Sequence, residues 1–130
     1  MAEMSHFLEN ALLNATLNAT TYTAPATVYV SLWTSNPTDA GSGTEVSGGS
    51  YARTAVSFAT ASGTSGNVLN DADVTFPTAT ASWGTVGWIG INDASTSGNL
   101  LYHTALDTAK AIDSGDIFKI STGNLSVTLA

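Results

Sequence analysis

A change in the hydrophobic period near Pro25 is the feature that most constrains the fold of this chain. Before Pro25, apolar residues recur at helical spacing and form one stripe, which comprises Met4, Phe7, Leu8, Ala11, Leu12 and Ala15. Such a stripe is typical of an amphipathic helix, so the sequence predicts a helix over residues 3–18. Ser5 can cap the start of this helix, and Pro25 lies beyond its end because proline does not continue a helix.

After Pro25 the apolar residues alternate with polar ones, which is the period of a β-strand. Segments of this kind, separated by turns rich in Gly and Asn, lie at residues 27–33, 54–60, 73–76, 86–91, 99–106, 116–120 and 125–129. Short strands at nearly regular spacing favour an antiparallel β-sandwich or jelly roll over a parallel sheet. The predicted fold is therefore all-β with a short N-terminal helix, in a single domain over residues 1–130.

Charged residues are scarce in this chain, and most of them are acidic. Ten Asp and Glu residues stand against three Lys and Arg residues, which gives a net charge of −7. Nucleic-acid binding needs clustered Lys and Arg, and an anionic membrane surface repels an acidic chain, so the sequence predicts neither partner. The chain has no cysteine, which excludes disulfides and thiol chemistry and is compatible with a reducing cytosol. No signal peptide or membrane-spanning run is evident.

The stretch LWTSNPTDAGSGTEVSGGSYAR, residues 32–53, has the glycine content and the carboxylates of a possible binding loop. A phosphate-binding P-loop requires a lysine directly after its glycines, and no lysine follows Gly48 and Gly49. Calcium requires six to eight oxygen ligands, and Asp39 and Glu45 supply too few carboxylates for a good site. The sequence therefore predicts a connection between strands with no functional metal and no cofactor.

Three further groups of residues have chemical potential but lack the spacing of a known site. Gly84, Gly87 and Gly90 do not follow the dinucleotide-binding pattern and lie in a strand, where glycine more often permits close packing. His6 and His103 are too few for a zinc site of recognisable spacing. No serine-nucleophile elbow is present. We therefore predict no catalytic residues and no metal ligands.

Asp71 and Asp73 would share one face of a strand, as the two carboxylates of a glycoside hydrolase can. This pair is the single feature of the sequence that supports an enzymatic alternative, a glycan hydrolase or lyase. The motif NDAD is more often a polar entry to a strand, so we predict that the protein is not an enzyme.

The aromatic residues and the helical stripe are candidates for contact with a partner. Trp88 lies in the most apolar strand and is predicted to be a core residue, whereas Trp83 follows a Ser- and Thr-rich turn and is the candidate exposed aromatic. The helical stripe fits two roles equally well, packing on the β domain or docking on a neighbouring subunit. Its candidate interface residues are Met4, Phe7, Leu8 and Leu12.

Three blocks of the sequence resemble a family of small structural proteins encoded by tailed bacteriophages. They are LWTSNPTDAGSGTEVSGGSYAR, NDADVTFPTATASWGTVGWIGINDASTSGNLLYH and GDIFKISTGNLSVTL, and the resemblance runs from about Phe7 to Leu129. Members of this family are labelled tail fibre protein or virion structural protein, and others of similar build look like capsid decoration (cement) proteins. The resemblance implies a virion component assembled in the bacterial host cytoplasm, and it implies no catalysis.

The first hypothesis is a non-enzymatic capsid decoration protein that stabilises the phage shell by binding the assembled lattice. The expected partners are further copies of the chain, with a trimer as the first expectation, and the major capsid protein. The alternative is a tail or tail-fibre component, with the tail proteins as partners, or an adhesin for host glycans. An unrelated carbohydrate-binding module is a further alternative, raised by the seven Trp and Tyr residues.

Overall fold

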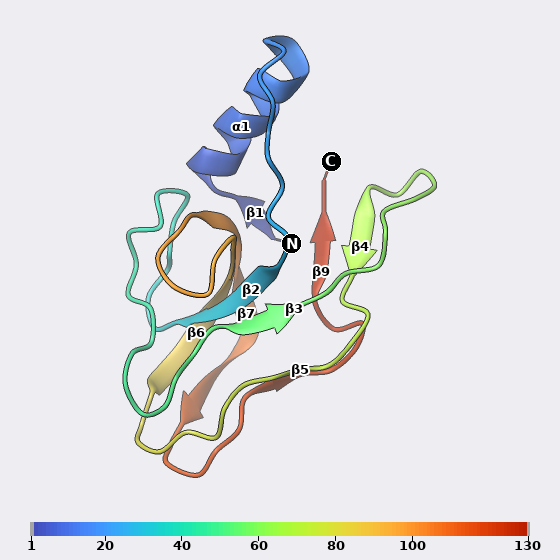
Figure 1. The fold of residues 1–130 in the computed structure, drawn as a ribbon. Helices are drawn as coiled ribbons and strands as arrows, with labels where there is room; N and C mark the ends of the chain where they lie inside the picture. Colours follow the sequence, from blue (N-terminus) through green and yellow to red (C-terminus); the bar gives the residue numbers. More distant parts are fainter. Residues whose placement is uncertain (1, 130) are drawn as a thin grey trace.

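A computed structural model describes residues 2–129 and shows an antiparallel β fold that carries one helix (Figure 1). The main sheet has five strands in the order β1-β7-β6-β2-β3. The strands are β1 (Glu3–Met4), β7 (Leu100–Ile112), β6 (Gly84–Asn92), β2 (Val28–Trp33) and β3 (Thr54–Val56). The all-β antiparallel class and the short N-terminal helix are thus confirmed.

Two short antiparallel ladders complete the β structure. One pairs β4 (Asn67–Leu69) with β9 (Ser126–Thr128), and the other pairs β5 (Val74–Thr75) with β8 (Lys119–Ile120). Their apolar residues join those of the main sheet in a single buried cluster. The second layer therefore consists of separate ladders rather than one continuous sheet, and the sheet arrangement of a jelly roll is not confirmed.

The core lies on one face of the main sheet because the alternation of β2 and β6 places their branched residues there. Val30 pairs with Ile91 and Leu32 pairs with Ile89, and all four side chains are buried. Residues directly opposite each other in an antiparallel pair lie on the same face, so these four form one apolar layer. Phe76 and Phe118 pack edge to face on each other and belong to the same buried cluster as this layer.

An irregularity in the pairing of β6 with β7 overturns the prediction for Trp88, and the prediction for Trp83 is wrong as well. The pairing of β6 with β7 shifts between Val86 and Trp88, so Val86 and Ile89 both face the core although they are three residues apart. Trp88 consequently lies on the opposite face and is only half-buried. Trp83 was predicted to be exposed and is instead buried, at 4% exposure.

Trp83 is buried because the stretch before β6 lies against the core. Its indole packs edge to face on the ring of Tyr51, with 5.4 Å between ring centroids, and its Nε1 donates to the carbonyl of Gly49 at 2.9 Å. A Cβ at Gly49 would lie 2.9 Å from that Nε1, and Gly49 has a φ of +56°, so this position requires glycine. The Ser- and Thr-rich turn that suggested exposure ends just before Trp83.

The other face of the main sheet is covered by the loop of residues 34–44, which joins the end of β2 to the bridge at Glu45. Beneath this loop lies a small, partly polar layer of buried side chains: Ser31, Trp33, Asn92, Leu100 and His103. A Cβ at Gly90 would lie 2.7 Å from Leu100 Cδ1 and 3.0 Å from Trp33 Nε1. The expected packing role of glycine in this strand is therefore confirmed at Gly90.

The helix α1 (His6–Leu17) is shorter than the predicted span of residues 3–18. Ser5 caps its start, as predicted, by accepting a hydrogen bond from the Leu8 amide at 3.2 Å. Glu3 and Met4 were predicted to be helical, but they form β1 and pair with His103 and Tyr102. Helical periodicity at Met4 was misleading because the edge of β7 supplies a strand partner.

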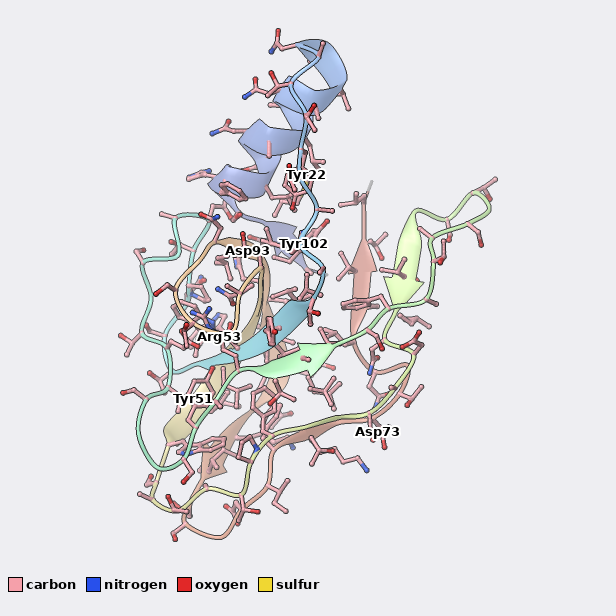
Figure 2. All side chains as sticks on the ribbon, in the orientation of Figure 1. Tyr22, Tyr51, Arg53, Asp73, Asp93 and Tyr102 are labelled. Carbon is pink, nitrogen blue, oxygen red and sulfur yellow. The ribbon has the colours of Figure 1, made fainter. Side chains whose placement is uncertain are left out.

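The helix and the chain that returns from it project away from the sheet (Figure 1). Residues 18–27, here called the return segment, run back along α1 to β2 without regular secondary structure. Tyr22 of this segment lies near Tyr102 of β7 where the projection meets the sheet (Figure 2). Burial, followed by the nearby Tyr22, raises the pKa of Tyr102 above its ordinary value. No helix among residues 2–129 is long and apolar enough to span a lipid bilayer.

Candidate functional site

The loop between β2 and β3 uses its charged residues to fasten itself to the fold. Arg53 donates from Nε to one oxygen of Glu45 at 2.9 Å and from Nη2 to the other at 2.8 Å. Its Nη1 donates to the carbonyl oxygens of Ala94 and Ser97, at 3.0 and 2.8 Å. The chain's one arginine therefore ties this loop to the loop of residues 93–99.

Tyr51 lies near Arg53 (Figure 2) and completes this network, which we call the Glu45 lock and which consists of Glu45, Tyr51 and Arg53. The hydroxyl of Tyr51 donates to Glu45 at 2.7 Å and accepts from the amide of Leu32 at 3.0 Å. Burial alone would raise the pKa of the Glu45 carboxyl, but the hydrogen bonds from Arg53 and Tyr51 hold it below its ordinary value. Burial, and then the hydrogen bond to Glu45, raise the pKa of Tyr51. The lock is a structural device in which Nε, Nη1 and Nη2 of Arg53 all donate to acceptors of the protein itself.

A second polar cluster, here called the foot cluster, lies where α1 meets the sheet and consists of Glu3, His6, Glu9, Asp39 and His103. Asp39 is shared between its two halves. One carboxylate oxygen of Asp39 lies 2.8 Å from Nε2 of His103, and the other lies 4.0 Å from Nδ1 of His6. Glu3 approaches His103 from β1 at 3.9 Å, and Glu9 approaches His6 from the first turn of α1 at 3.3 Å.

Sequence reasoning treated these residues separately and missed the cluster. Asp39 was considered with Glu45 as a calcium loop, yet Glu45 is engaged in the lock and lies in a different network. His103 was considered with His6, whereas its hydrogen-bond partner is Asp39, which is 64 positions away in the chain. No local spacing could have revealed this, because both histidines are brought together by the pairing of β1 with β7 and by the fold of the loop.

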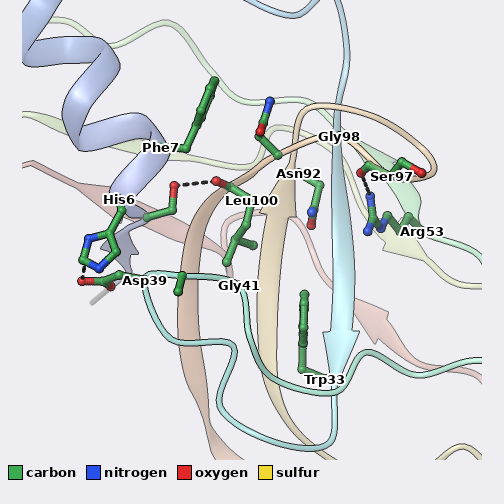
Figure 3. A pocket seen from close by; sticks show the side chains of 13 residues that line it. His6, Phe7, Trp33, Asp39, Gly41, Arg53, Asn92, Ser97, Gly98 and Leu100 are labelled. Atoms are coloured by element: carbon green, nitrogen blue, oxygen red, sulfur yellow. Dashed lines mark hydrogen bonds and ion pairs between the residues drawn. The ribbon is translucent and has the colours of Figure 1, made fainter.

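A pocket of about 310 Å³ lies beside the foot cluster, between α1, the loop of residues 34–44 and the loop of residues 93–99 (Figure 3). Phe7, Trp33 and Leu100 line its apolar part. Most of its polar side chains already have partners: Arg53 is held in the lock, and Asn92 accepts a hydrogen bond from Ser31 at 2.7 Å. The pocket therefore offers few free polar groups for recognising a sugar.

Asp71 and Asp73 do not form a pair. Asp71 accepts a hydrogen bond from Ser57, whereas Asp73 accepts from the amide and the hydroxyl of Thr122 and lies 3.2 Å from Lys119. The hydrogen bonds from Thr122, followed by Lys119, lower the pKa of Asp73. A glycosidase acid requires a raised pKa, so the geometry gives no support to the hydrolase alternative.

The helix carries two faces of different exposure. Its inner face comprises Leu8, Ala11, Leu12 and Ala15, which are buried or half-buried against the protein's own fold. Its outer face comprises Phe7, Asn10, Leu13, Asn14 and Leu17, all of them exposed. Leu13 and Leu17 are 54% and 74% exposed.

The predicted interface set falls on both faces of the helix and beyond it. Leu8 is buried, so its side chain cannot meet a partner without leaving the core, and its assignment to the interface was wrong. Leu12 is half-buried on the inner face, and Met4 is half-buried in β1. Of the predicted set, Phe7 alone lies on the outer face. Leu13 and Leu17 were overlooked because they fall outside the stripe that the helical spacing selects.

These features define a class: a small antiparallel β protein with a projecting helix, whose charged loop residues fasten the fold. Residues 3–128 match the family described as "Podophage GP4 fiber I protein gp80", so the chain belongs to this family of phage fibre-type structural proteins. The resemblance to tailed-phage virion structural proteins is thereby confirmed, and membership of this family implies a virion component. A comparison with curated proteins found no match.

Proposed function

We propose that the protein is a non-enzymatic subunit of a podophage fibre and that copies of it assemble through the outer face of α1. The proposal rests on the family match, which favours the fibre alternative over capsid decoration. The observation that carries the mode of assembly is the exposure of Leu13 and Leu17 on a projecting helix. A fibre is built from chains that meet at repeated contacts, and a helix that stands clear of the sheet can supply such a contact.

The distribution of charge supports self-association at this place. No Asp, Glu, Lys or Arg occurs between Asn10 and Thr38, a run that contains most of α1 and all of the return segment. Apart from Glu3 and Glu9, the acidic residues of this −7 chain lie at or after Asp39. Two copies that meet through the outer face of α1 beyond Glu9 therefore avoid the like-charge repulsion that other surfaces would add.

The spacing on the outer face suits helix packing. Phe7, Asn10, Asn14 and Leu17 are separated by three, four and three residues, which is the spacing of the contact positions in a coiled coil. Asparagine at such a position favours a particular register and number of helices at some cost in stability. A closed ring of copies about one axis, with a trimer as the first expectation, is consistent with this arrangement.

The absence of an assembled acid–base pair at Asp71 and Asp73 supports a structural role rather than catalysis. The few free polar groups of the pocket beside Phe7 give little support to a glycan adhesin. Capsid decoration, with the major capsid protein as the partner, is the rival location within the virion. The lack of cysteine suits assembly in the bacterial cytoplasm before the virion is released.

Assembly is tested by changing the outer face without touching the core. In multi-angle light scattering, the wild-type protein is expected to form an oligomer and the Leu13→Ser, Leu17→Ser double variant to shift towards the monomer. Ile117→Ser is the matched control, because Ile117 is also exposed, at 55%, but lies outside the projection. A wild-type monomer, or equal effects of the double variant and the control, would sink the proposed interface.

A charge placed on the outer face of α1 gives a second, independent test of the proposed interface. Asn10→Asp adds a carboxylate where the proposed copies meet, so it should weaken the oligomer at low salt and less so at high salt.

The location of the protein in the virion is tested separately by labelling intact virions with antibody against this chain. Label on the fibres supports the proposal, and label spread over the shell would favour capsid decoration.

A further inference from the structure

The foot cluster brings both histidines of the chain to one carboxylate. We propose that Glu3, Asp39 and His103 form a binding site for a divalent transition-metal ion of the zinc type. This inference is independent of the proposed assembly, because it concerns the isolated chain. It also differs from the calcium loop that the sequence excluded, since its ligands come from β1, the loop after β2 and β7.

The types of ligand fit such an ion. Zinc is bound by imidazole nitrogen and carboxylate oxygen, whereas calcium selects sites made of oxygen alone. His103 offers Nε2, and Glu3 and Asp39 offer one carboxylate oxygen each, with the three atoms within 4.8 Å of one another. One imidazole and two carboxylates make a mixed set that suits zinc and its neighbours in the first transition row.

The spacing of these atoms fits as well. Ligands about 2.0 to 2.1 Å from a tetrahedral zinc lie about 3.3 Å from one another. In the cluster, the distance from His103 Nε2 to Asp39 is 2.8 Å and that to Glu3 is 3.9 Å, one shorter and one longer than this edge. Small rotations of the exposed Glu3 and the half-exposed Asp39 side chains can equalise the two distances.

Burial gives the site a fixed ligand and an open entrance. The side chain of His103 is 5% exposed and is held under the loop, so its orientation is set before an ion arrives. The Glu3 side chain is 71% exposed, so the site is open to solvent on the side of this ligand. Binding would exchange the hydrogen bond between His103 and Asp39 for two bonds to the metal, and it requires that Nε2 of His103 carries no proton.

The outer half of the foot cluster has a simpler explanation. His6, Glu9 and Asp39 surround the first turn of α1, where carboxylates are stabilised by the helix dipole and a cation is disfavoured. The Asp39 carbonyl also accepts the amide of His6 at 2.9 Å, which fastens the loop to the helix.

The test uses the full chain, free of any affinity tag and stripped with a chelator, in isothermal titration with Zn²⁺. One ion per chain is expected, with a rise in melting temperature on binding. Glu3→Gln should weaken binding by at least about tenfold, which is the lower range for the loss of a supporting group at a metal site. Because Glu3 is exposed, this variant is expected to keep the fold. Co²⁺ in place of Zn²⁺ would report imidazole and carboxylate ligation by its visible absorption.

Two control variants locate the ion. His103→Gln keeps a donor for Asp39 but removes the imidazole, so it should abolish binding while circular dichroism reports the fold. Glu9→Gln changes the outer half alone and should leave binding within about twofold, since Glu9 is not a ligand of the proposed site. Absence of binding by the wild-type chain would overturn the proposal. Binding that survives Glu3→Gln and His103→Gln, or that is lost with Glu9→Gln, would also overturn it, because the ion would then lie elsewhere.

Discussion

Two segments of similar length lie on either side of β2 and behave in opposite ways. The loop of residues 34–53 has little regular structure but is fastened by the Glu45 lock and by Asp39. The segment of residues 6–27 contains a regular helix, yet it projects from the sheet and exposes Leu13 and Leu17 (Figure 1). Regular secondary structure is therefore no measure of how firmly a segment is held in this protein.

The placement of charge explains the difference. In the loop, Arg53 and Glu45 turn towards the fold and satisfy each other's hydrogen bonds. In the projection, the charged residues stop at Glu9, and the exposed positions are held by leucine, asparagine and threonine. The molecule uses several of its few charges to fasten its loops, whereas the part of α1 beyond Glu9 carries no charge and projects from the sheet. This arrangement is consistent with the proposed assembly through the outer face of α1.

The largest expected effect is the loss of Trp83, which anchors the loop to the core. Trp83→Ala removes the packing on Tyr51 and the hydrogen bond to Gly49, and should lower the free energy of unfolding by about 3–5 kcal/mol. Trp88→Ala is the matched control and should cost clearly less, because Trp88 is half-buried on the other face. Denaturant unfolding measures both. Equal losses for the two variants would show that the rings of Trp83 and Trp88 do not differ in how much they contribute to the core.

Breaking the Glu45 lock is expected to be the next largest effect. Arg53→Ala leaves the carboxylate of Glu45 half-buried with a single remaining donor, Tyr51, and should cost about 2–4 kcal/mol. Lys119→Ala removes an exposed ion pair with Asp73 and should cost clearly less than Arg53→Ala. Hydrogen exchange of the loop amides should rise with Arg53→Ala. If exchange rose equally throughout α1, the loop and the projection would not be independent.

The Glu45 lock also predicts how the loss of unfolding free energy in Arg53→Ala depends on pH. The pKa of Glu45 is lowered in the folded state, so its contribution is complete above the unfolded value of about 4.5 and is lost as the pH falls through the folded value. The difference in unfolding free energy between the wild type and Arg53→Ala should therefore be largest near neutral pH and should narrow below pH 4.5. Denaturant unfolding at several pH values checks this. A difference that stays constant down to the acid range would mean that Glu45 does not carry the effect.

The sequence predicted well what depends on local pattern. Alternation located β2, and the cap at Ser5 and the all-β class followed from residue types alone. The features that the sequence did not predict depend on contacts between residues that are distant in the chain. β1 forms because β7 offers an edge, and the register shift between β6 and β7 beside Trp88 places that ring on the face opposite to the one expected from its neighbours. The foot cluster depends on a pairing of His103 with Asp39 that no local spacing encodes.

The smallest expected effect is on the outer face of α1. Leu17→Ser should change the free energy of unfolding by less than about 0.5 kcal/mol, because the side chain is 74% exposed and loses no core contact. Leu8→Ala, on the inner face of the same helix, should cost about 2–5 kcal/mol or release α1 from the sheet. Limited proteolysis within residues 6–27 reports such release even when the sheet stays folded. If Leu17→Ser destabilised a monomeric sample as much as Leu8→Ala does, the outer face would be part of the core. The projection would then lose its distinction from the loop.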